Sequence, residues 1–355
     1  MMALLAGLMD GAASGLTGCP DPEEVTAAAM RHGVLPLVYA GLGAAPAISH
    51  ANGGGDALDP LRTALANLAR TEAAVDAIRV AACRQVIQSL HEAGVPTLVF
   101  KGSALAFSHY PRSDLRPRDD TDLLVEESDL PVLHSTLTDL GYTQAIASSG
   151  KLMSHQRLYS AIDPRRIRHN FDVHWRISNR HRYARMFDLG ELLENALPIP
   201  GWPSTARCPC PVDALLIAAL HRASHRGTDR LVWLYDIHRL LAAMNDDECQ
   251  LLADRARAKG LVDEYRHAVA GAQYFFSKGS RPPRHVARGV RTIDIWLADL
   301  KALPSWRARI ALLKEHAFPP GDYMRRAGAG SKGLNLPIAY LVRGLRGSLK
   351  LFRRA

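Results

Sequence analysis

Two aspartates, Asp120 and Asp122, have the residue type and the spacing needed to bind a divalent cation. They are separated by one residue, and a β-strand projects side chains at i and i+2 from the same face. Two neighbouring carboxylates repel each other unless a cation lies between them. Mg²⁺ prefers oxygen ligands and keeps waters and substrate phosphates in its shell. The pair therefore predicts a Mg²⁺ site beside a phosphate group, with Mn²⁺ as an alternative ion.

A third carboxylate, Asp172, strengthens this interpretation, because an isolated Asp-x-Asp pair is more often a solvated turn than a metal site. Apolar and polar residues alternate over 171–177, which predicts a strand with Asp172, His174 and Arg176 on one wet face. A carboxylate there could bind the catalytic ion or act as general base toward a hydroxyl group. The alternative is a solvated acid on an edge strand.

The segment Lys101-Gly102-Ser103 lies between a short apolar run, 96–100, and the start of a predicted helix. Backbone amides at a helix N-terminus can face a phosphate, and Gly102 permits close approach. Lys101 and Ser103 could contact phosphate oxygens, although a Gly-Ser turn is also common at strand ends. The pattern Gly-x-x-x-x-Gly-Lys-Ser/Thr is absent from the sequence, which argues against a P-loop ATPase.

Arg116, four residues before Asp120, could bind a triphosphate oxygen or orient the carboxylates through a bidentate pair. A surface arginine in a Pro-flanked loop is an equally good interpretation. Asp236 could support residues of the active site without contacting the substrate, or it could be an acid on a helix surface.

Seven further residues, two His, two Cys and three aromatic ones, carry weaker signals. His221 and His225 are one helical turn apart, but the sequence places no third ligand near them, so packing, polar contacts or substrate binding are favoured over metal binding. Cys208 and Cys210 alternate with prolines, which indicates an extended connector rather than half of a metal site. Trp175, Trp233 and Tyr235 receive no site role, since aromatic residues at such spacings are usually core.

The elements that must position these residues follow from periodicity and from Gly and Pro punctuation. We expect a long helix over 61–93 and strands over 96–100, 122–125 and 171–177, with a helix over 128–140. We expect short helices within 20–42, a loop over 44–55, and helices over 213–225, 231–244 and 248–270, the last with a break at Gly260.

Composition and charge restrict the class of protein. The chain has 355 residues, 47% of them hydrophobic and 22% charged, which is typical of a folded protein with two or three packed subdomains. The net charge of +9 favours polyanionic partners. Five scattered cysteines, no signal-peptide pattern and no run of about 20 apolar residues predict a cytoplasmic protein that does not cross a membrane.

Much of the positive charge lies in the tail, where eight Lys or Arg residues and no acid follow Asp322. The segment 341–354 intersperses apolar and basic residues like a basic amphipathic helix. Peripheral contact with an anionic membrane is one interpretation. Docking of its leucine face onto the core is the preferred one.

Several of these segments together resemble the bacterial nucleotidyltransferases related to DNA polymerase β and the minimal nucleotidyltransferases. The resemblance spans about residues 20–245. It rests on the segments Val99 to Gly102, Arg116 to Val125, Asp172 to Trp175, and His221 with Leu231 to Asp236, in that order along the chain.

The resemblance implies an α+β fold, with a polymerase β-type core of a small mixed sheet and helices between N- and C-terminal helical regions. The expected regions are 1–93 (helical), 94–205 (catalytic core), 206–320 (helical) and 321–355 (basic tail). It also implies that Gly102 and Ser103 bind phosphate and that Asp120, Asp122 and Asp172 carry the metal.

The activity expected from the residues and the resemblance is transfer of a nucleoside monophosphate from an NTP such as ATP to a hydroxyl or phosphate acceptor, with pyrophosphate leaving. The acceptor stays open: a small molecule, sugar, peptide, RNA or protein. One alternative is a non-catalytic nucleotide-sensing or partner-binding protein on the same fold. Another is a toxin-like enzyme that modifies RNA or protein, for which the basic tail is the support.

Overall fold

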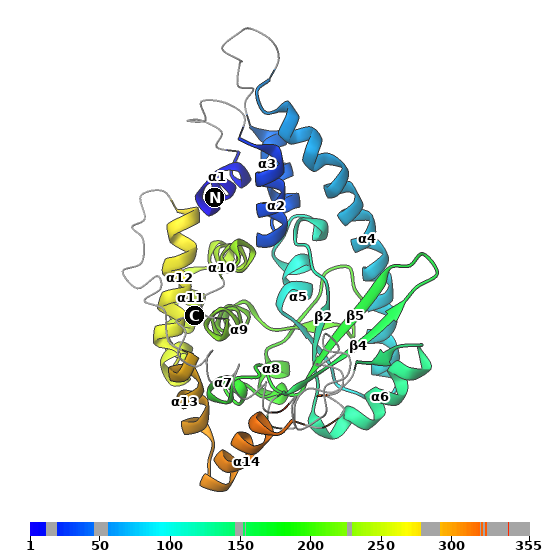
Figure 1. The fold of residues 1–355 in the computed structure, drawn as a ribbon, viewed down its shortest axis with the longest axis vertical. Helices are drawn as coiled ribbons and strands as arrows, with labels where there is room; N and C mark the ends of the chain where they lie inside the picture. The colour runs from blue at the N-terminus through cyan, green and yellow to red at the C-terminus, as the bar shows by residue number, and fades with distance from the viewer. Residues whose placement is uncertain are drawn as a thin grey trace.

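The computed structural model has an α+β fold in which one mixed sheet is surrounded by helices (Figure 1). This confirms the fold class expected from the sequence. The structure describes residues 1–11, 20–45, 56–145, 152, 154–225, 229–277, 292–319, 321, 324 and 340. Most of the basic tail, 321–355, and all of its amphipathic segment, 341–354, lie outside the described residues.

The described helices, in chain order, are α1 (Met2–Met9), α2 (Pro22–His32), α3 (Leu35–Ala44), α4 (Asp59–Glu92), α5 (Lys101–Ser108), α6 (Leu130–Asp139), α7 (His181–Ala184), α8 (Leu189–Glu194), α9 (Pro211–Ser224), α10 (Leu231–Ala243), α11 (Asp246–Ala258), α12 (Val262–Phe276), α13 (Thr292–Ala302) and α14 (Trp306–Ala317). Two short 3₁₀ helices cover Ser113–Leu115 and Glu127–Asp129.

The strands are β1 (Leu98–Phe100), β2 (Thr121–Leu124), β3 (Thr143–Gln144), β4 (Gln156–Ile162), β5 (Arg168–His174), β6 (Leu197–Pro198) and β7 (Arg207–Cys208). They form one sheet in the order β3-β4-β5-β2-β1-β7-β6. At its centre β2 runs antiparallel to β1 and parallel to β5.

The two faces of this sheet have different partners, because successive side chains of a strand point to opposite faces. Leu123 on β2 and Val173 on β5 belong to the buried cluster that α4 and α6 contribute to. Asp122 and Asp172 are the neighbours of these residues along the strands, so they point to the other face, where α5 and α9 lie. The helices on that face therefore enclose the candidate site.

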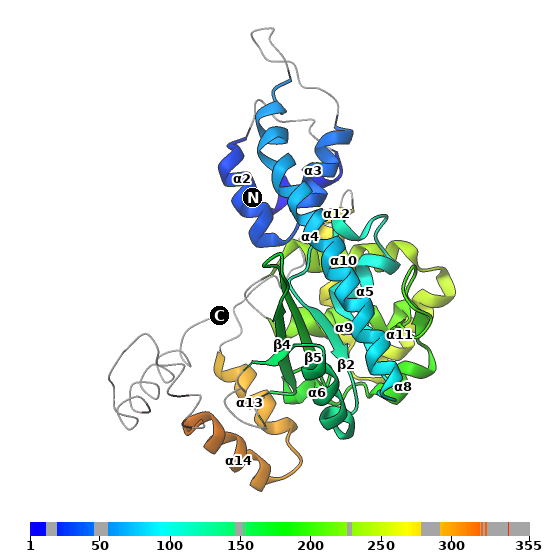
Figure 2. The ribbon, with the colours of Figure 1, turned by 90° about the vertical axis from the view of Figure 1, so that its right-hand side faces the viewer.

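The long helix α4 links the sheet to the N-terminal helices. Its 34 residues extend roughly 50 Å, because each helical residue adds 1.5 Å. Its first half packs against α2 and α3, and residues of its second half, such as Val86 and Leu90, pack on the sheet (Figure 2). The helix predicted over 61–93 is thereby confirmed, and α4 spans both parts of the fold.

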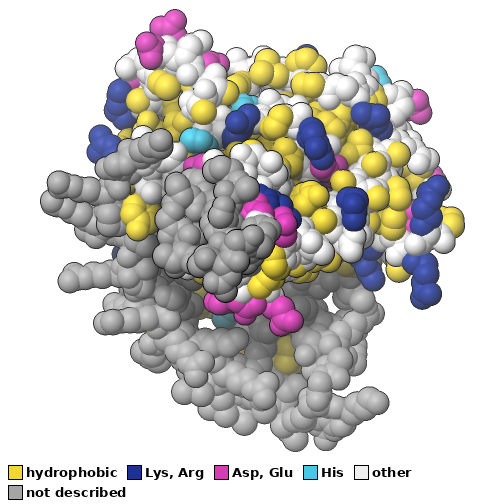
Figure 3. Space-filling view, turned by 90° about the horizontal axis from the view of Figure 1, so that it is seen from above, with side chains coloured by type: hydrophobic (Ala, Val, Ile, Leu, Met, Phe, Trp, Pro, Cys, Tyr) yellow, Lys and Arg dark blue, Asp and Glu magenta, His cyan; other side chains and the backbone are white. Residues whose placement is uncertain are grey.

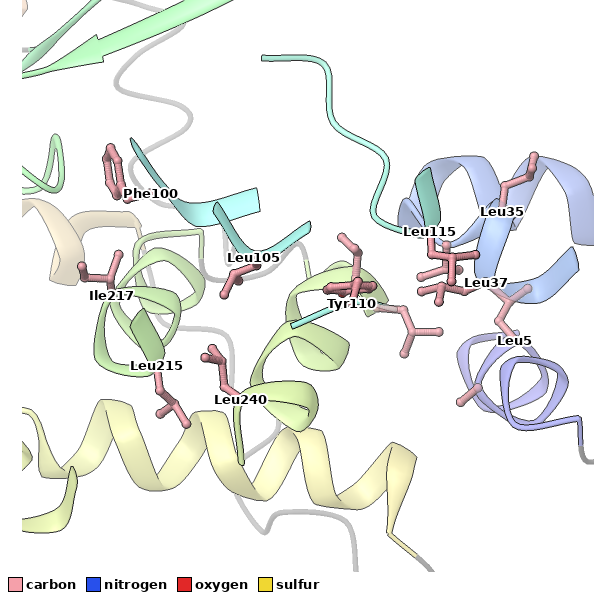
Figure 4. Close-up of a cluster of buried hydrophobic side chains, with 14 of the residues drawn as sticks. Leu5, Leu35, Leu37, Phe100, Leu105, Tyr110, Leu115, Leu215, Ile217 and Leu240 are labelled. Carbon is pink, nitrogen blue, oxygen red and sulfur yellow. The ribbon is translucent and has the colours of Figure 1, made fainter. Parts of the chain in front are cut away.

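The larger hydrophobic cluster is continuous from the N-terminal helices to the C-terminal ones. Figure 4 shows it running from Leu5 and Leu37, on α1 and α3, past Tyr110 to Leu240 on α10 and Ile217 on α9. All five side chains are buried. The N-terminal helices are consequently packed against the rest of the protein and can contribute to the walls of the site.

Most of the predicted elements are confirmed, whereas the loop expected over 44–55 lies, beyond residue 45, outside the described residues. The helical break expected at Gly260 separates α11 from α12, and Gly260 has a φ of 66°. The strand expected over 171–177 begins and ends three residues earlier, at Arg168 and His174, because its pairing with β4 sets its length. The sequence analysis did not predict β4.

Surface charge on the described residues is mixed. On the face seen from above, Lys and Arg side chains are spread among hydrophobic and uncharged ones (Figure 3).

Among the described helices, none combines the length and the apolar character needed to cross a bilayer.

Candidate active site

A cavity of about 860 Å³ opens between α4, α5, α9 and the N-terminal helices. Its walls include all three aspartates singled out in the sequence, together with Lys101 and Gly102. Gly33 and Leu35, from the end of α2 and the start of α3, also line it. Its volume lies in the range usual for small-molecule and cofactor sites.

Strand register brings Asp122 and Asp172 side by side, because they are paired residues on the parallel strands β2 and β5. His174, two residues after Asp172, projects from the same face. One ligand atom from each of Asp122, Asp172 and His174 lies within 4.8 Å of the others. Among the described residues, these three form the one group of acidic, His or Cys side chains arranged to hold an ion. The group does not include Asp120.

Lys101 supplies the nearest positive charge. Its Nζ lies 2.6 Å from Oδ1 of Asp122 and 3.3 Å from Nε2 of His174. Its backbone has a φ of 55°, in the left-handed region that non-glycine residues rarely occupy. Such backbone strain persists when the surrounding structure imposes it. Here it occurs where β1 turns directly into α5 and directs the ammonium group toward the carboxylates.

Asp172 has one carboxylate oxygen engaged and one available. Nε2 of Gln156, on β4, donates a hydrogen bond of 2.7 Å to Oδ2 of Asp172. Oδ1 of Asp172 is buried without a hydrogen-bond partner among the described residues, and so is Nδ1 of His174. Buried polar atoms of this kind usually have partners. An oxygen with no partner, next to a second carboxylate, fits a divalent cation.

The pKa values of the two aspartates on β2 are shifted in opposite directions. Burial alone would raise the pKa of Asp122, but Lys101 and a hydrogen bond from His174 outweigh burial and hold it well below its usual range. Burial, followed by repulsion from Asp122 and Asp172, raises the pKa of Asp120 to about 6. Asp120 is exposed, and Lys101 lowers its pKa by less than burial and the two neighbouring carboxylates raise it.

Ser103 and Gly102 have structural contacts in addition to their predicted role. The Ser103 hydroxyl is almost fully buried and donates a hydrogen bond of 3.1 Å to the backbone carbonyl of Asp120. It thereby ties the start of α5 to the turn that carries Asp120. A Cβ atom added to Gly102 would lie 2.9 to 3.0 Å from the guanidinium group of Arg116. Any residue other than glycine at this position would therefore displace Arg116. Phosphate binding by both residues stays a prediction.

Arg116 is buried and forms a bidentate pair with Asp236 on α10, with both N–O distances at 2.8 Å. The interpretation of Arg116 as a surface residue is therefore wrong, and so is that of Asp236 as a helix-surface acid. Tyr110 donates a further hydrogen bond of 2.6 Å to Asp236. This pair joins the loop before β2 to α10. Direct binding of a triphosphate by Arg116 stays a prediction.

Two contributors to the site were not identified from the sequence. His174 was placed on a wet strand face, whereas its side chain is only 2% exposed and contacts Asp122. The sequence feature that could have identified His174 is its position two residues after Asp172 on the same strand. Gln156 carried no such signal, because it acts from the unpredicted strand β4.

The remaining His and Cys predictions are consistent with the geometry. His221 and His225 pack against each other, with ring centroids 4.5 Å apart. Cys208 and Cys210 are free thiols next to prolines, and burial is the largest factor raising their pKa values.

The carboxylates on adjacent strands, the Lys-Gly-Ser turn and the surrounding helices define a protein of the nucleotidyltransferase class. The chain belongs to the family described as uncharacterised nucleotidyltransferase, whose sequence profile matches residues 19–277. No curated protein matches the chain.

Among solved structures, the chain is similar to the solution structure of the antibiotic-resistance factor ANT(2'')-Ia. The identity is 14%, and the match covers 54% of this chain and 98% of that chain. The TM-score is 0.38, which is too low to carry an argument about the site.

Proposed function

We propose that the protein transfers a nucleoside monophosphate from an NTP to a hydroxyl or phosphate oxygen of an acceptor. The acceptor oxygen forms a bond to the α-phosphorus, the bond from that phosphorus to the bridging oxygen breaks, and pyrophosphate leaves. The observation that carries this proposal is the paired position of Asp122 and Asp172, two residues that line the cavity, together with the buried, unpartnered Oδ1 of Asp172. Family membership supports the class of reaction.

Each described group has a role in this proposal. Asp122, Asp172 and His174 would hold Mg²⁺ or Mn²⁺, and Asp120 would complete the ligand set. The ion would polarise the phosphate and stabilise the leaving pyrophosphate. Lys101 and the amides at the start of α5 would bind phosphate oxygens, since a helix N-terminus carries partial positive charge.

Asp172 would position the acceptor and accept its proton when the acceptor is a hydroxyl group. Gln156 fixes the orientation of the Asp172 carboxylate through the hydrogen bond to Oδ2, which leaves Oδ1 directed to the ion or the acceptor. Fixed orientation matters because most of the catalysis in phosphoryl transfer comes from positioning and charge stabilisation.

The test is to incubate the protein with each α-labelled NTP, Mg²⁺ and a cell lysate, and to follow both pyrophosphate release and the molecule that acquires label. The expected result is label on one class of acceptor together with an equal amount of pyrophosphate. A control without lysate measures NTP hydrolysis alone. Release of labelled NMP into water with no labelled acceptor would contradict nucleotidyl transfer.

The non-catalytic alternative has one observation in its favour. The Lys101 ammonium already neutralises Asp122, so the cavity could bind a nucleotide phosphate without a metal. Under this alternative, NTP binds but no acceptor ever acquires label. Equilibrium binding of Mg²⁺–NTP measured together with pyrophosphate release across many acceptors separates the two functions, because both bind NTP and only transfer releases pyrophosphate.

A further inference from the structure

Three rings from α9 and α10 form a contiguous group on one wall of the cavity. The centroid of His221 lies 4.5 Å from that of His225 and 4.8 Å from that of Trp233. The centroids of His225 and Trp233 lie 5.3 Å apart. All three residues line the cavity, and we call this group the aromatic wall.

The aromatic wall begins beside the phosphate-binding corner of the cavity. His221 interacts electrostatically with both Lys101 and Asp122, which places its ring close to the groups that would hold the triphosphate. The rings of Trp233 and His225 adjoin His221 and extend the wall from it. His225 is exposed and Trp233 is half-buried, so both rings keep surface that a ligand can cover.

Two rings of this wall, His221 and Trp233, have uncharged faces. Burial, and then the nearby positive charge of Lys101, lower the pKa of His221 well below its ordinary value, so this imidazole is neutral at physiological pH. A neutral ring and an indole offer flat faces for stacking, and neither face repels a planar uncharged group.

The opposite side of the cavity has a different character. Figure 1 shows α5 between α4 on one side and α9 and α10 on the other. The α4 side contributes Glu72 and Asp76, and Asp119 lies close enough to Glu72 to raise its pKa further after burial. Arg79 and Arg118 also line this side, and Arg118 pairs with Asp76, so the side is charged and poorly suited to stacking.

We propose that the aromatic wall of His221, His225 and Trp233 binds the base of the nucleoside triphosphate. The inference rests on the proposed function and assigns the position of the base within it. A nucleoside on a triphosphate held at Lys101 and Asp122 must extend along one wall of the cavity, and this wall begins there. Every nucleobase has a π-face, so stacking supplies affinity and little discrimination among the four bases.

The test compares the affinity for a complete nucleotide with that for its phosphate part alone. Dissociation constants for each Mg²⁺–NTP and for Mg²⁺–tripolyphosphate are measured by calorimetry on the full chain and on Trp233→Leu and His225→Ala. For the NTP that binds best, each variant is expected to bind about tenfold more weakly. The affinity for tripolyphosphate is expected to stay within about twofold of wild type, because stacking does not involve the phosphates.

Two controls keep the outcomes distinct. Trp233→Phe keeps a ring and is expected to recover most of the NTP affinity. Tyr235→Leu removes a ring of α10 that instead contacts Tyr110 and Phe276, and is expected to leave both affinities unchanged.

Unchanged NTP affinity in both Trp233→Leu and His225→Ala would overturn the aromatic wall as the base site and leave the proposed function standing. An equal loss of NTP and tripolyphosphate affinity in His225→Ala, an exposed position, would overturn it as well. Failure of the wild-type protein to bind any NTP would instead overturn the proposed function, and this inference with it.

Discussion

The ammonium nitrogen of Lys101 lies 2.6 Å from Oδ1 of Asp122 and 3.3 Å from Nε2 of His174. It therefore contacts two of the three side chains that are grouped closely enough to hold an ion. A divalent cation entering this group has to share Asp122 with the ammonium or replace it. A triphosphate would give Lys101 a new partner, so binding of the ion and binding of the nucleotide should be coupled.

Lys101→Gln is expected to bind Mn²⁺ alone about tenfold more tightly than wild type, because Asp122 no longer exchanges a charged hydrogen bond for the ion. The same variant should bind NTP more weakly, because it lacks the positive charge for the phosphates. Electron paramagnetic resonance of free Mn²⁺ measures the first effect and calorimetry the second. Lys259→Gln is the matched control, since Lys259 forms a comparably short ion pair with Glu191. Weaker Mn²⁺ binding by Lys101→Gln would contradict the competition.

Asp120→Asn and Asp122→Asn are each expected to reduce transfer by ~10²-fold or more while the fold is kept. Each change removes anionic charge from the ion with almost no change in side-chain volume. Pyrophosphate release measures activity, and circular dichroism checks the fold. Asp114→Asn, in the same loop, is the control. Near wild-type turnover in either test variant would remove that residue from the metal site.

Asp236→Asn is expected to lower the free energy of unfolding by about 3 kcal/mol, because it leaves Arg116 buried without its counter-charge. Urea denaturation measures the loss. In the double variant Arg116→Met/Asp236→Leu the unpaired charge is gone, so part of the stability should return. If Asp236→Asn instead kept its stability and lost only NTP affinity, Arg116 would act on the nucleotide and not on the packing of α10.

Local periodicity was sufficient to predict the elements that carry the aspartates. Alternation around Asp172 and the apolar run before Lys101 each indicated a strand, and α4 followed from a long stretch without Gly or Pro. The i and i+2 spacing predicted that Asp120 and Asp122 face the same way; both line the cavity, but Asp120 precedes β2 and lies outside the group of ligand atoms. These features depend on residues close together in the chain, which a single sequence displays directly.

Partners that are distant in the chain could not be predicted in the same way. Arg116 pairs with Asp236 across 120 positions, and nothing near either residue specifies the other. Only Tyr159 of β4 is buried, so this strand does not need the strict alternation of apolar and polar residues by which a strand is predicted. Its pairing with β5 comes from tertiary context, which often decides strand formation. Gln156 was missed for this reason.

The lowered pKa of His155 predicts how the free energy of unfolding depends on pH in acid. Burial, followed by the charges of His181, Arg176 and Arg185, lowers the pKa of His155 to about 4, from an ordinary value of 6.5. Between these two pH values the unfolded chain takes up a proton that the folded protein does not. Stability should therefore fall as the pH falls from 6.5 to 4, with a contribution of at most about 1.4 kcal/mol per pH unit.

His155→Phe keeps a ring beside Trp175 and cannot titrate, so its unfolding free energy should depend less steeply on pH in this window. Urea denaturation at intervals from pH 4 to 7 measures the slope. His91→Phe, at an exposed position on α4, is the control. An identical slope in His155→Phe and wild type would show that His155 does not contribute to the loss of stability in acid.

Substitution of Asp172 is expected to affect the rate of transfer more than the affinity for the nucleotide. Its Oδ2 accepts a hydrogen bond from Gln156, and its Oδ1 has no partner among the described residues. Asp120, Asp122 and His174 would remain to hold a metal–triphosphate complex without the Asp172 carboxylate, whereas that carboxylate is needed mainly to position the acceptor or take its proton. Asp172→Asn should therefore lower the single-turnover rate by ~10²-fold or more, while the affinity for Mg²⁺–NTP falls much less.

Single-turnover rates and equilibrium NTP binding, measured on both proteins with the identified acceptor, decide between three outcomes for Asp172→Asn. A loss of rate with nearly unchanged affinity supports the role at the acceptor. A parallel loss of both would make Asp172 a primary ligand of the ion that carries the nucleotide. Gln156→Leu is the matched variant, because it removes only the group that orients Asp172. It should reduce the rate by less than Asp172→Asn and leave NTP affinity unchanged, and an unchanged rate in both variants would exclude Asp172 from the reaction.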